Sequence, residues 1–221
     1  MNTLRILFLL FLFVGCQSQE NGTATTQQPT QPKQQVPTDI TVVDPTNILE
    51  YYLVLPIDFF SYTICGQKDS KAAREKAIKK QHIKNGYLLF DEECTGSPNE
   101  IVLFKDRANN KDVIALTKYH GDMQQTFHLL QYYDGEWKRI RDTHFPDDDE
   151  ILNRITSQEP SYSAATKEAL ENAKEMDDIV SFDLLLPEIG DDIKVIINRE
   201  LTQEDVLLAT IKWTGSKFEL K

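Results

Sequence analysis

The chain has 221 residues, of which 40% are hydrophobic, and its 24 Lys and Arg against 35 Asp and Glu give a formal net charge of −11. Such an acidic surface repels phosphate backbones and anionic lipid headgroups, so it argues against a nucleic-acid partner and favours cationic partners or divalent metal. Even without its first 45 residues, the chain is long enough for one good-sized core or two small ones.

The first segment, residues 1–15, has the pattern of a signal peptide. Arg5 precedes an apolar run that is shorter than the roughly 20 residues of a membrane-spanning helix. The letters FVGC, residues 13–16, resemble the lipobox of bacterial lipoproteins, although the first of them is usually Leu. The resemblance implies that Cys16 is acylated and attaches the mature protein to a lipid bilayer. In such lipoproteins an Asp directly after the acylated Cys favours the inner membrane. This chain has Gln17 there, so the resemblance implies the outer membrane, and it leaves open which face of that membrane carries the protein.

Residues 16–45 predict a flexible linker. They are rich in Gln, Thr and Pro and contain few apolar side chains, so they cannot offset the entropy of ordering. A chain of this length has a root-mean-square span on the order of 30 Å. We therefore expect a domain over residues 46–221 that stands clear of the bilayer.

Two helices are predicted at the start of this domain. Thr46 or Asn47 can cap a short first helix, which must end before Pro56 because the residue before proline avoids helical geometry. The Ala- and Lys-rich stretch that follows predicts a second helix over about 70–83, stopped by Asn85-Gly86.

Cys65 and Cys94 lie in a domain that the leader predicts to be exported, where two thiols usually form one disulfide. Such a bond would contribute roughly 3 to 4 kcal/mol in the chain-entropy model; the alternative is two free thiols. It would also make the adjacent acidic loop, Asp91, Glu92 and Glu93, rigid enough to act as a binding edge. The alternative for this loop is a plain polar connection between strands.

A run of apolar segments separated by polar or Gly-, Pro- and Asn-containing stretches predicts antiparallel strands at 87–90, 101–104, 113–119 and 126–133. Asp134-Gly135 then supplies the residue pair of a tight hairpin turn.

The stretch 141–152 contains the densest acidic cluster. Asp147, Asp148, Asp149 and Glu150 could offer oxygen atoms to a calcium ion, and the three Asp could offer charge to a partner, but the run lacks the alternating spacing and turning Gly of an EF-hand loop. The competing interpretation is the start of a helix, with the acids in its first turn and apolar residues packing inward behind them.

The second half repeats the order of helix and strands. Ser163 is placed to cap a helix over 163–178, and strand-like runs follow at 179–186, 191–198, 206–213 and 217–220. The whole domain is therefore predicted to be α+β, with antiparallel meanders and packed helices. A helix-plus-meander unit used twice, in halves 46–150 and 151–221, and a chance likeness between two meanders both remain open.

Several segments resemble a group of bacterial exported lipoproteins with no assigned activity: YYLVLP, NGYLLF, IVLFKD, LLQYYDGEWKRI and IKWTGSKFEL. The resemblance covers most of residues 48–221. Its matching positions are apolar strand and turn residues, so it implies a fold and brings no site residue.

No catalytic motif is apparent. The four histidines, His82, His120, His128 and His144, lack the spacing of a zinc site, and neither a nucleophile elbow nor a phosphate-binding glycine loop is present. His128, inside an apolar run, is expected to be half-buried. No cofactor or metal is predicted.

The leading hypothesis is a non-enzymatic lipoprotein binding module of the cell envelope, which contacts a protein or an envelope polymer through an acidic surface. One form of it is an inhibitor of a cationic hydrolase. The rivals are an envelope hydrolase that uses a carboxylate pair or a metal, with His144, Asp147 and Asp149 as candidates, and a structural accessory of a larger envelope complex.

Overall fold

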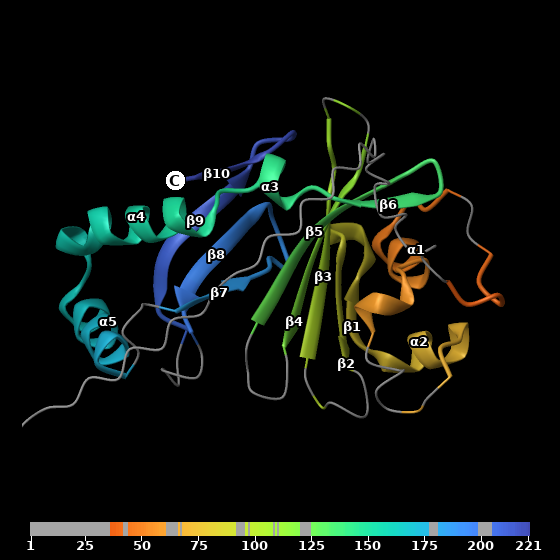
Figure 1. Cartoon of the computed structure of the whole chain (residues 1–221), viewed down its shortest axis with the longest axis horizontal. Helices are drawn as coiled ribbons and strands as arrows, with labels where there is room; N and C mark the ends of the chain where they lie inside the picture. Colours follow the sequence, from red (N-terminus) through yellow and green to blue (C-terminus); the bar gives the residue numbers. More distant parts are fainter. Residues whose placement is uncertain are drawn as a thin grey trace, which may run out of the picture. The chain divides into compact units, whose positions relative to one another are not determined.

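Two antiparallel sheets form the framework of the protein (Figure 1). The computed structural model describes residues 36–41, 44–60, 66, 68–91, 96, 98–107, 109, 111–119, 125–176, 181–198 and 205–221. These residues belong to one unit, Gln34–Lys221. Cys16, Cys65, Cys94, Glu92, Glu93 and His120 lie outside them, so the predicted acylation and disulfide stay predictions.

The first sheet is a six-stranded meander in which each strand pairs with the next along the chain. Its strands are β1 (Ile78–His82), β2 (Tyr87–Asp91), β3 (Pro98–Phe104), β4 (Val113–Tyr119), β5 (Gln125–Tyr133) and β6 (Glu136–Arg139). Asp134 and Gly135, with φ of 53° and 79°, form the turn between β5 and β6. Left-handed geometry at both positions is what a two-residue hairpin with the right twist requires. The four predicted strands and this turn are confirmed.

Two short helices cover one face of this sheet (Figure 1). Helix α1 (Ile48–Leu53) is capped by Asn47, whose side chain accepts hydrogen bonds from two backbone N–H groups, as predicted. The 3-10 turn η1 (Ile57–Phe59) and helix α2 (Lys71–Ala77) follow. Alternate residues of the strands pack against the helices and form the helix-side core, which includes Ile48, Tyr52, Leu55, Leu88, Ile101, Ile114 and Leu116.

The predicted helix over 70–83 is correct at its start and wrong at its end. Ser70 caps it as expected, but α2 ends at Ala77, and the next five residues form the edge strand β1. These residues, apart from partly buried Ile78, are exposed, so no apolar stripe holds them in a helix. Pairing with β2 decides their conformation instead. The Asn-Gly pair ends the 3-10 turn η2 (Ile83–Asn85), with Gly86 at φ 70°.

Three α-helices and a 3-10 turn then lead to the second sheet. They are α3 (Arg141–His144), α4 (Asp148–Gln158), η3 (Glu159–Ser161) and α5 (Ala164–Met176). The second sheet contains β7 (Phe182–Leu185), β8 (Asp192–Ile197), β9 (Leu207–Trp213) and β10 (Phe218–Leu220), in the order β10-β9-β8-β7. The predicted cap is confirmed, because Ser163 Oγ accepts a hydrogen bond from Thr166 N at 3.1 Å.

The second sheet, α4 and α5 share a core with the other face of the first sheet. This inter-sheet core includes Val102, Phe104, Ala115, Leu129, Ile151, Leu170, Val195, Ile211 and Trp213. Neighbouring residues of β3 and β4 therefore alternate between two cores, as the period of a strand requires. The fold is α+β, and the order of helices followed by an antiparallel meander occurs twice, with six strands and then four.

The described end of the predicted linker touches the domain. Asp39 Oδ2 accepts a hydrogen bond from the backbone N–H of Lys71 at 3.0 Å, and Ile40 packs partly against the helix-side core. Pro45 is buried. No helix within the described ranges has the length and apolar character needed to cross a membrane.

Candidate functional site

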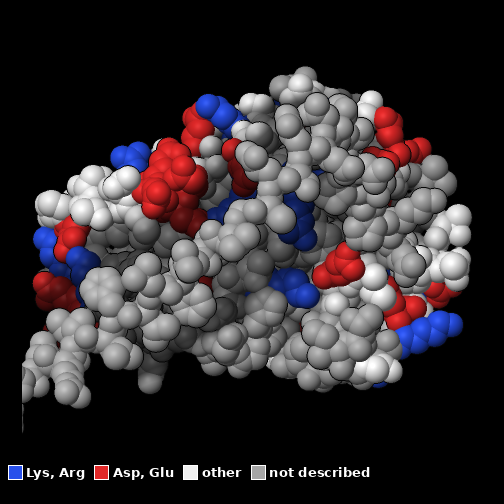
Figure 2. Space-filling view, viewed as in Figure 1, with Lys and Arg blue, Asp and Glu red and all other residues white. Residues whose placement is uncertain are grey.

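The acidic run predicted as a partner or calcium site starts helix α4, as its competing interpretation held. Asp147 is the N-cap and accepts a hydrogen bond from Glu150 N at 2.7 Å, while Asp148 pairs with Arg141. Acids in a first turn are stabilised by the helix dipole. Ile151 and Ile155 behind them are buried. Figure 2 shows the acidic side chains gathered over the start of α4.

The described residues do not form a metal-binding site. No group of three His, Cys, Asp or Glu side chains among them could hold an ion. His144 Nδ1 lies 2.7 Å from Thr143 Oγ1. The structure thus does not assemble His144, Asp147 and Asp149 into the metal site that the hydrolase hypothesis required. His128 is half-buried as expected, with its ring 5.2 Å from that of Phe59.

Asp91, the described member of the other acidic candidate, ends β2. It faces Lys79, with Nζ 4.0 Å from Oδ2, while its Oδ1 is buried and has no hydrogen-bond partner among the described residues. Glu92 and Glu93 are outside the described residues, so the proposed binding edge remains a prediction.

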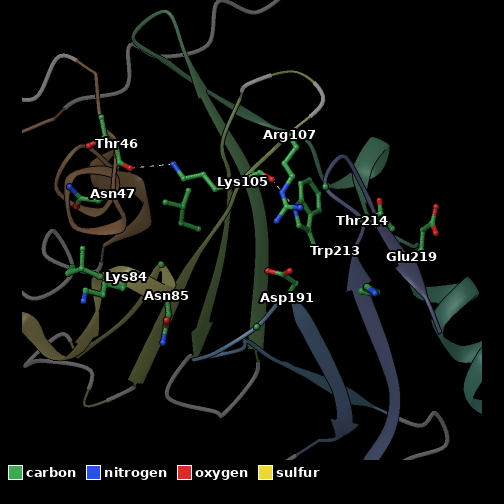
Figure 3. Close-up of a pocket in the computed structure, with 16 residues that line it drawn as sticks. Thr46, Asn47, Lys84, Asn85, Lys105, Arg107, Asp191, Trp213, Thr214 and Glu219 are labelled. Carbon is green, nitrogen blue, oxygen red and sulfur yellow. Dashed lines mark hydrogen bonds between the residues drawn. The ribbon is translucent and has the colours of Figure 1, made fainter.

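A groove of about 840 Å³ lies where η2, the end of β3, the start of α1 and the β9–β10 turn meet (Figure 3). Figure 3 shows Lys84 and Asn85 on one side, Lys105 and Arg107 in the middle, and Trp213 and Thr214 on the other side. Its remaining labelled residues are Thr46, Asn47, Asp191 and Glu219.

Backbone hydrogen bonds fix the walls of this groove. Gly86 O accepts from Leu103 N at 2.8 Å, and a Cβ on Gly86 would lie 2.9 Å from Leu103 O, so this close approach requires glycine. Gly215 O accepts from Arg107 N at 3.0 Å. The indole of Trp213 donates to Lys105 O at 3.1 Å. The two sheets are therefore joined at the floor, and the charged side chains stand on a fixed frame.

The groove is positively charged in an acidic protein. Its lining contains four cations, Lys84, Lys105, Arg107 and Lys212, and two carboxylates, Asp191 and Glu219. Lys105 forms an ion pair with Asp112, which does not line the groove. Glu219 Oε1 is 3.0 Å from Lys217 Nζ.

Three of these cations, Lys84, Arg107 and Lys212, have no ion-pair partner within 4.0 Å among the described residues. Lys212 lies opposite Asp192 and Glu219 in the strand register. Both acids are already paired with other lysines, Lys221 and Lys217. The three cations can therefore bind an anion without breaking an existing ion pair.

The start of α1 forms one rim of the groove and carries two side chains whose pKa values are shifted, Glu50 and Tyr51. The backbone N–H of Thr46 donates to Glu50 Oε2 at 2.7 Å, and this hydrogen bond lowers the pKa of the Glu50 carboxyl. Burial, followed by the nearby Asp112 carboxylate, raises the pKa of Tyr51, whose hydroxyl lies 3.0 Å from Asp112 Oδ2. Glu50 is thereby held ionised at the helix start, and Tyr51 stays a neutral hydrogen-bond donor.

Comparison of the chain with family models, curated proteins and solved structures gave no match. The resemblance to exported lipoproteins therefore stays a prediction. The groove was not predicted from the sequence, because Lys84, Arg107 and Lys212 lie far apart along the chain and only the meeting of the two sheets brings them to one site.

Proposed function

We propose that the protein is a lipid-anchored, non-enzymatic binding module of the cell envelope, and that its groove takes an anionic part of a protein or an envelope polymer. The observation that carries the proposal is the set of three cations, Lys84, Arg107 and Lys212, that line one groove and have no carboxylate partner among the described residues. The anchor rests on the leader and Cys16, as argued from the sequence.

The sign of the ligand's charge follows from the electrostatic field at the groove and not from the net charge of the protein. At the groove, four cations face two carboxylates, an excess of two positive charges. An anion bound there gains from several cations at once, and Arg107 can offer a carboxylate or phosphate two parallel hydrogen bonds. The remaining acidic surface repels strongly charged polyanions elsewhere on the molecule, which confines anion binding to the groove.

The acidic start of α4 supports the inhibitor hypothesis less well. Two of its acids are engaged, Asp147 as the cap and Asp148 with Arg141. Binding of a cationic hydrolase at this surface remains a separate prediction, tested by titrating the protein with a lysozyme at low salt.

A small polyvalent anion tests the groove directly. Citrate titrated into the Cys16→Ala full chain should shift amide NMR signals of the groove, with an affinity that falls as salt rises. Changing Lys84, Arg107 and Lys212 together to Gln should abolish these shifts. A matched control changes three exposed lysines outside the groove, Lys71, Lys174 and Lys194, to Gln and should leave the signal shifts intact. Equal effects of the two triple variants would contradict the proposal.

The anchor has its own test. Cells fed a clickable fatty acid should label the wild-type protein, and Cys16→Ala should remove the label. A labelled Cys16→Ala protein would refute the lipoprotein assignment and leave the groove proposal standing.

A further inference from the structure

A second cavity, of about 380 Å³, adjoins the groove and shares Thr46, Lys105 and Arg107 with it. Lys105 and Arg107, which follow β3, line both cavities and so lie where the two meet. Between them, the carboxylate of Asp106 accepts hydrogen bonds from the backbone and side-chain N–H groups of Asn109, both at 2.9 Å, which fixes the backbone here. The two cavities therefore meet at a fixed ridge that carries Lys105 and Arg107.

The second cavity adds aromatic side chains to the site. Tyr133 is 43% exposed at the end of β5. Its neighbour Tyr132 packs edge-on or tilted against Tyr51 and Trp137, with ring centroids 6.3 Å and 5.2 Å away. The inner rings fix the wall of the cavity, and the outer ring faces solvent.

This cavity also adds a cation, Lys111, and two carboxylates, Asp106 and Asp112, which already bind Asn109 and Lys105. Lys111 Nζ lies 4.0 Å from the centroid of the Tyr133 ring, and no carboxylate within 4.0 Å pairs with it among the residues that the structure describes. Because the ammonium group lies over one face of the Tyr133 ring, one ring of a ligand can contact the other face or the ring edge while its acidic substituent binds the ammonium group. Cations that have no carboxylate partner in the described part of the chain therefore occur in both cavities: Lys84 and Lys212 in the groove, and Lys111 in the second cavity.

We propose that the two cavities form one extended site for an acidic polysaccharide, whose carboxylate or phosphate groups bind the cations while a sugar ring contacts Tyr133. This inference rests on the proposed function, since it names the ligand class of the same groove. A polymer fits better than a small anion because the cations are divided between two adjoining cavities, and each added contact strengthens binding of a linked chain.

The lining chemistry favours a glycan over other polyanions. A sugar ring presents C–H groups to an aromatic face and hydroxyls to polar side chains. Asn85 supplies an amide, and the hydroxyls of Thr46 and Thr214, which donate to Glu50 and Lys217, can still accept a hydrogen bond. Double-stranded DNA carries a charge about every 1.7 Å along its axis and meets the repulsion of a protein with net charge −11. A glycan with at most one acid per ring gains the groove contacts at a smaller long-range cost.

Oligogalacturonates provide the probe, because each ring carries one carboxylate. Calorimetric titration of the Cys16→Ala full chain with the monomer, trimer and hexamer should show affinity rising with length, by about 30-fold or more from monomer to hexamer. Tyr133→Ser and Lys111→Gln should each weaken hexamer binding by up to about tenfold and leave monomer binding unchanged. Leu207→Ser, which removes another exposed apolar side chain outside both cavities, is the matched control and should change neither.

Two results would overturn this inference alone. The first is equal affinity for monomer and hexamer, or no binding of either while citrate still binds the groove. The second is a hexaglutamate peptide that binds as tightly as hexagalacturonate and is insensitive to Tyr133→Ser, which would assign the site to an acidic protein segment. Failure of citrate and all oligogalacturonates to bind would instead remove the proposed function. Circular dichroism of each variant confirms that it is folded.

Discussion

Arg74 shows how one buried charge can organise the start of the domain. It has no exposed surface, and its guanidinium pairs with Asp69 through two hydrogen bonds. It stacks 4.1 Å from the centroid of the Phe60 ring. A third nitrogen, Nη1, donates to three backbone carbonyl groups at and just after the end of α1, those of Tyr52, Leu53 and Leu55. Arg74 therefore supplies the hydrogen bonds that the end of a helix needs.

Replacing Arg74 with Leu should lower the free energy of unfolding by about 3 to 5 kcal/mol, because Asp69 and the helix-end carbonyls lose their partner while remaining buried. Arg74→Lys should recover little, since an ammonium group cannot reproduce the fork. Urea denaturation followed by circular dichroism measures both. The comparison variant is Lys71→Ala, whose exposed pair with Glu75 should contribute less than about 1 kcal/mol. Similar losses for Arg74→Leu and Lys71→Ala would contradict this role.

At the scale of elements, a single side chain joins the edge of the second sheet to the first. The Gln125 amide, at the start of β5, accepts a hydrogen bond from Leu184 N at 2.7 Å and donates one to Leu184 O at 2.9 Å. The same nitrogen lies 2.8 Å from the Tyr119 hydroxyl. The Gln125 side chain thus forms the two hydrogen bonds that a neighbouring strand would form with β7. It satisfies backbone groups that a sheet edge would otherwise leave unpaired.

Gln125→Glu should therefore destabilise the protein, although the two side chains have nearly the same size. A carboxylate keeps the acceptor for Leu184 N but places its second oxygen against Leu184 O, so we expect a loss of about 1 to 3 kcal/mol at neutral pH. Protonation restores a donor, so the loss should shrink as the pH falls below the ordinary carboxyl range. Unfolding measured across that range tests this, with Gln131→Glu on the same strand as control. A loss independent of pH would contradict the two-way bond.

The elements that the sequence predicts well are those in which local pattern and tertiary packing agree. The strand predicted at 113–119 matches β4, whose residues alternate between the two cores. The helix predicted to reach 83 fails, because residues 78–82 have helical propensity but no face to bury, and β2 offers them a partner. The groove could not be predicted from local pattern, since Lys84, Arg107 and Lys212 come from elements that meet only in the folded domain.

At the scale of the whole molecule, the distribution of charge matters more than its sum. The chain carries −11 overall, yet the acids at the start of α4 stabilise a helix, and the cations collect where the two sheets join. Net charge alone predicts a cationic partner. The arrangement in space supports an anionic ligand instead, because binding depends on the field at the site.

The end of the predicted linker is attached to the domain. Residues 16–45 have the composition of a linker, but Asp39 bonds to the first N–H of α2 and Ile40 packs partly on the helix-side core. Deleting residues 1–35 should leave the unfolding free energy within about 0.5 kcal/mol, whereas deleting 1–45 should lower it by about 1 to 3 kcal/mol through the lost hydrogen bond and apolar burial. Asp39→Ala and Ile40→Ser in the longer form should each reproduce part of that loss. Equal stability of the two truncated proteins would show that the linker ends at residue 45, as its composition alone predicts.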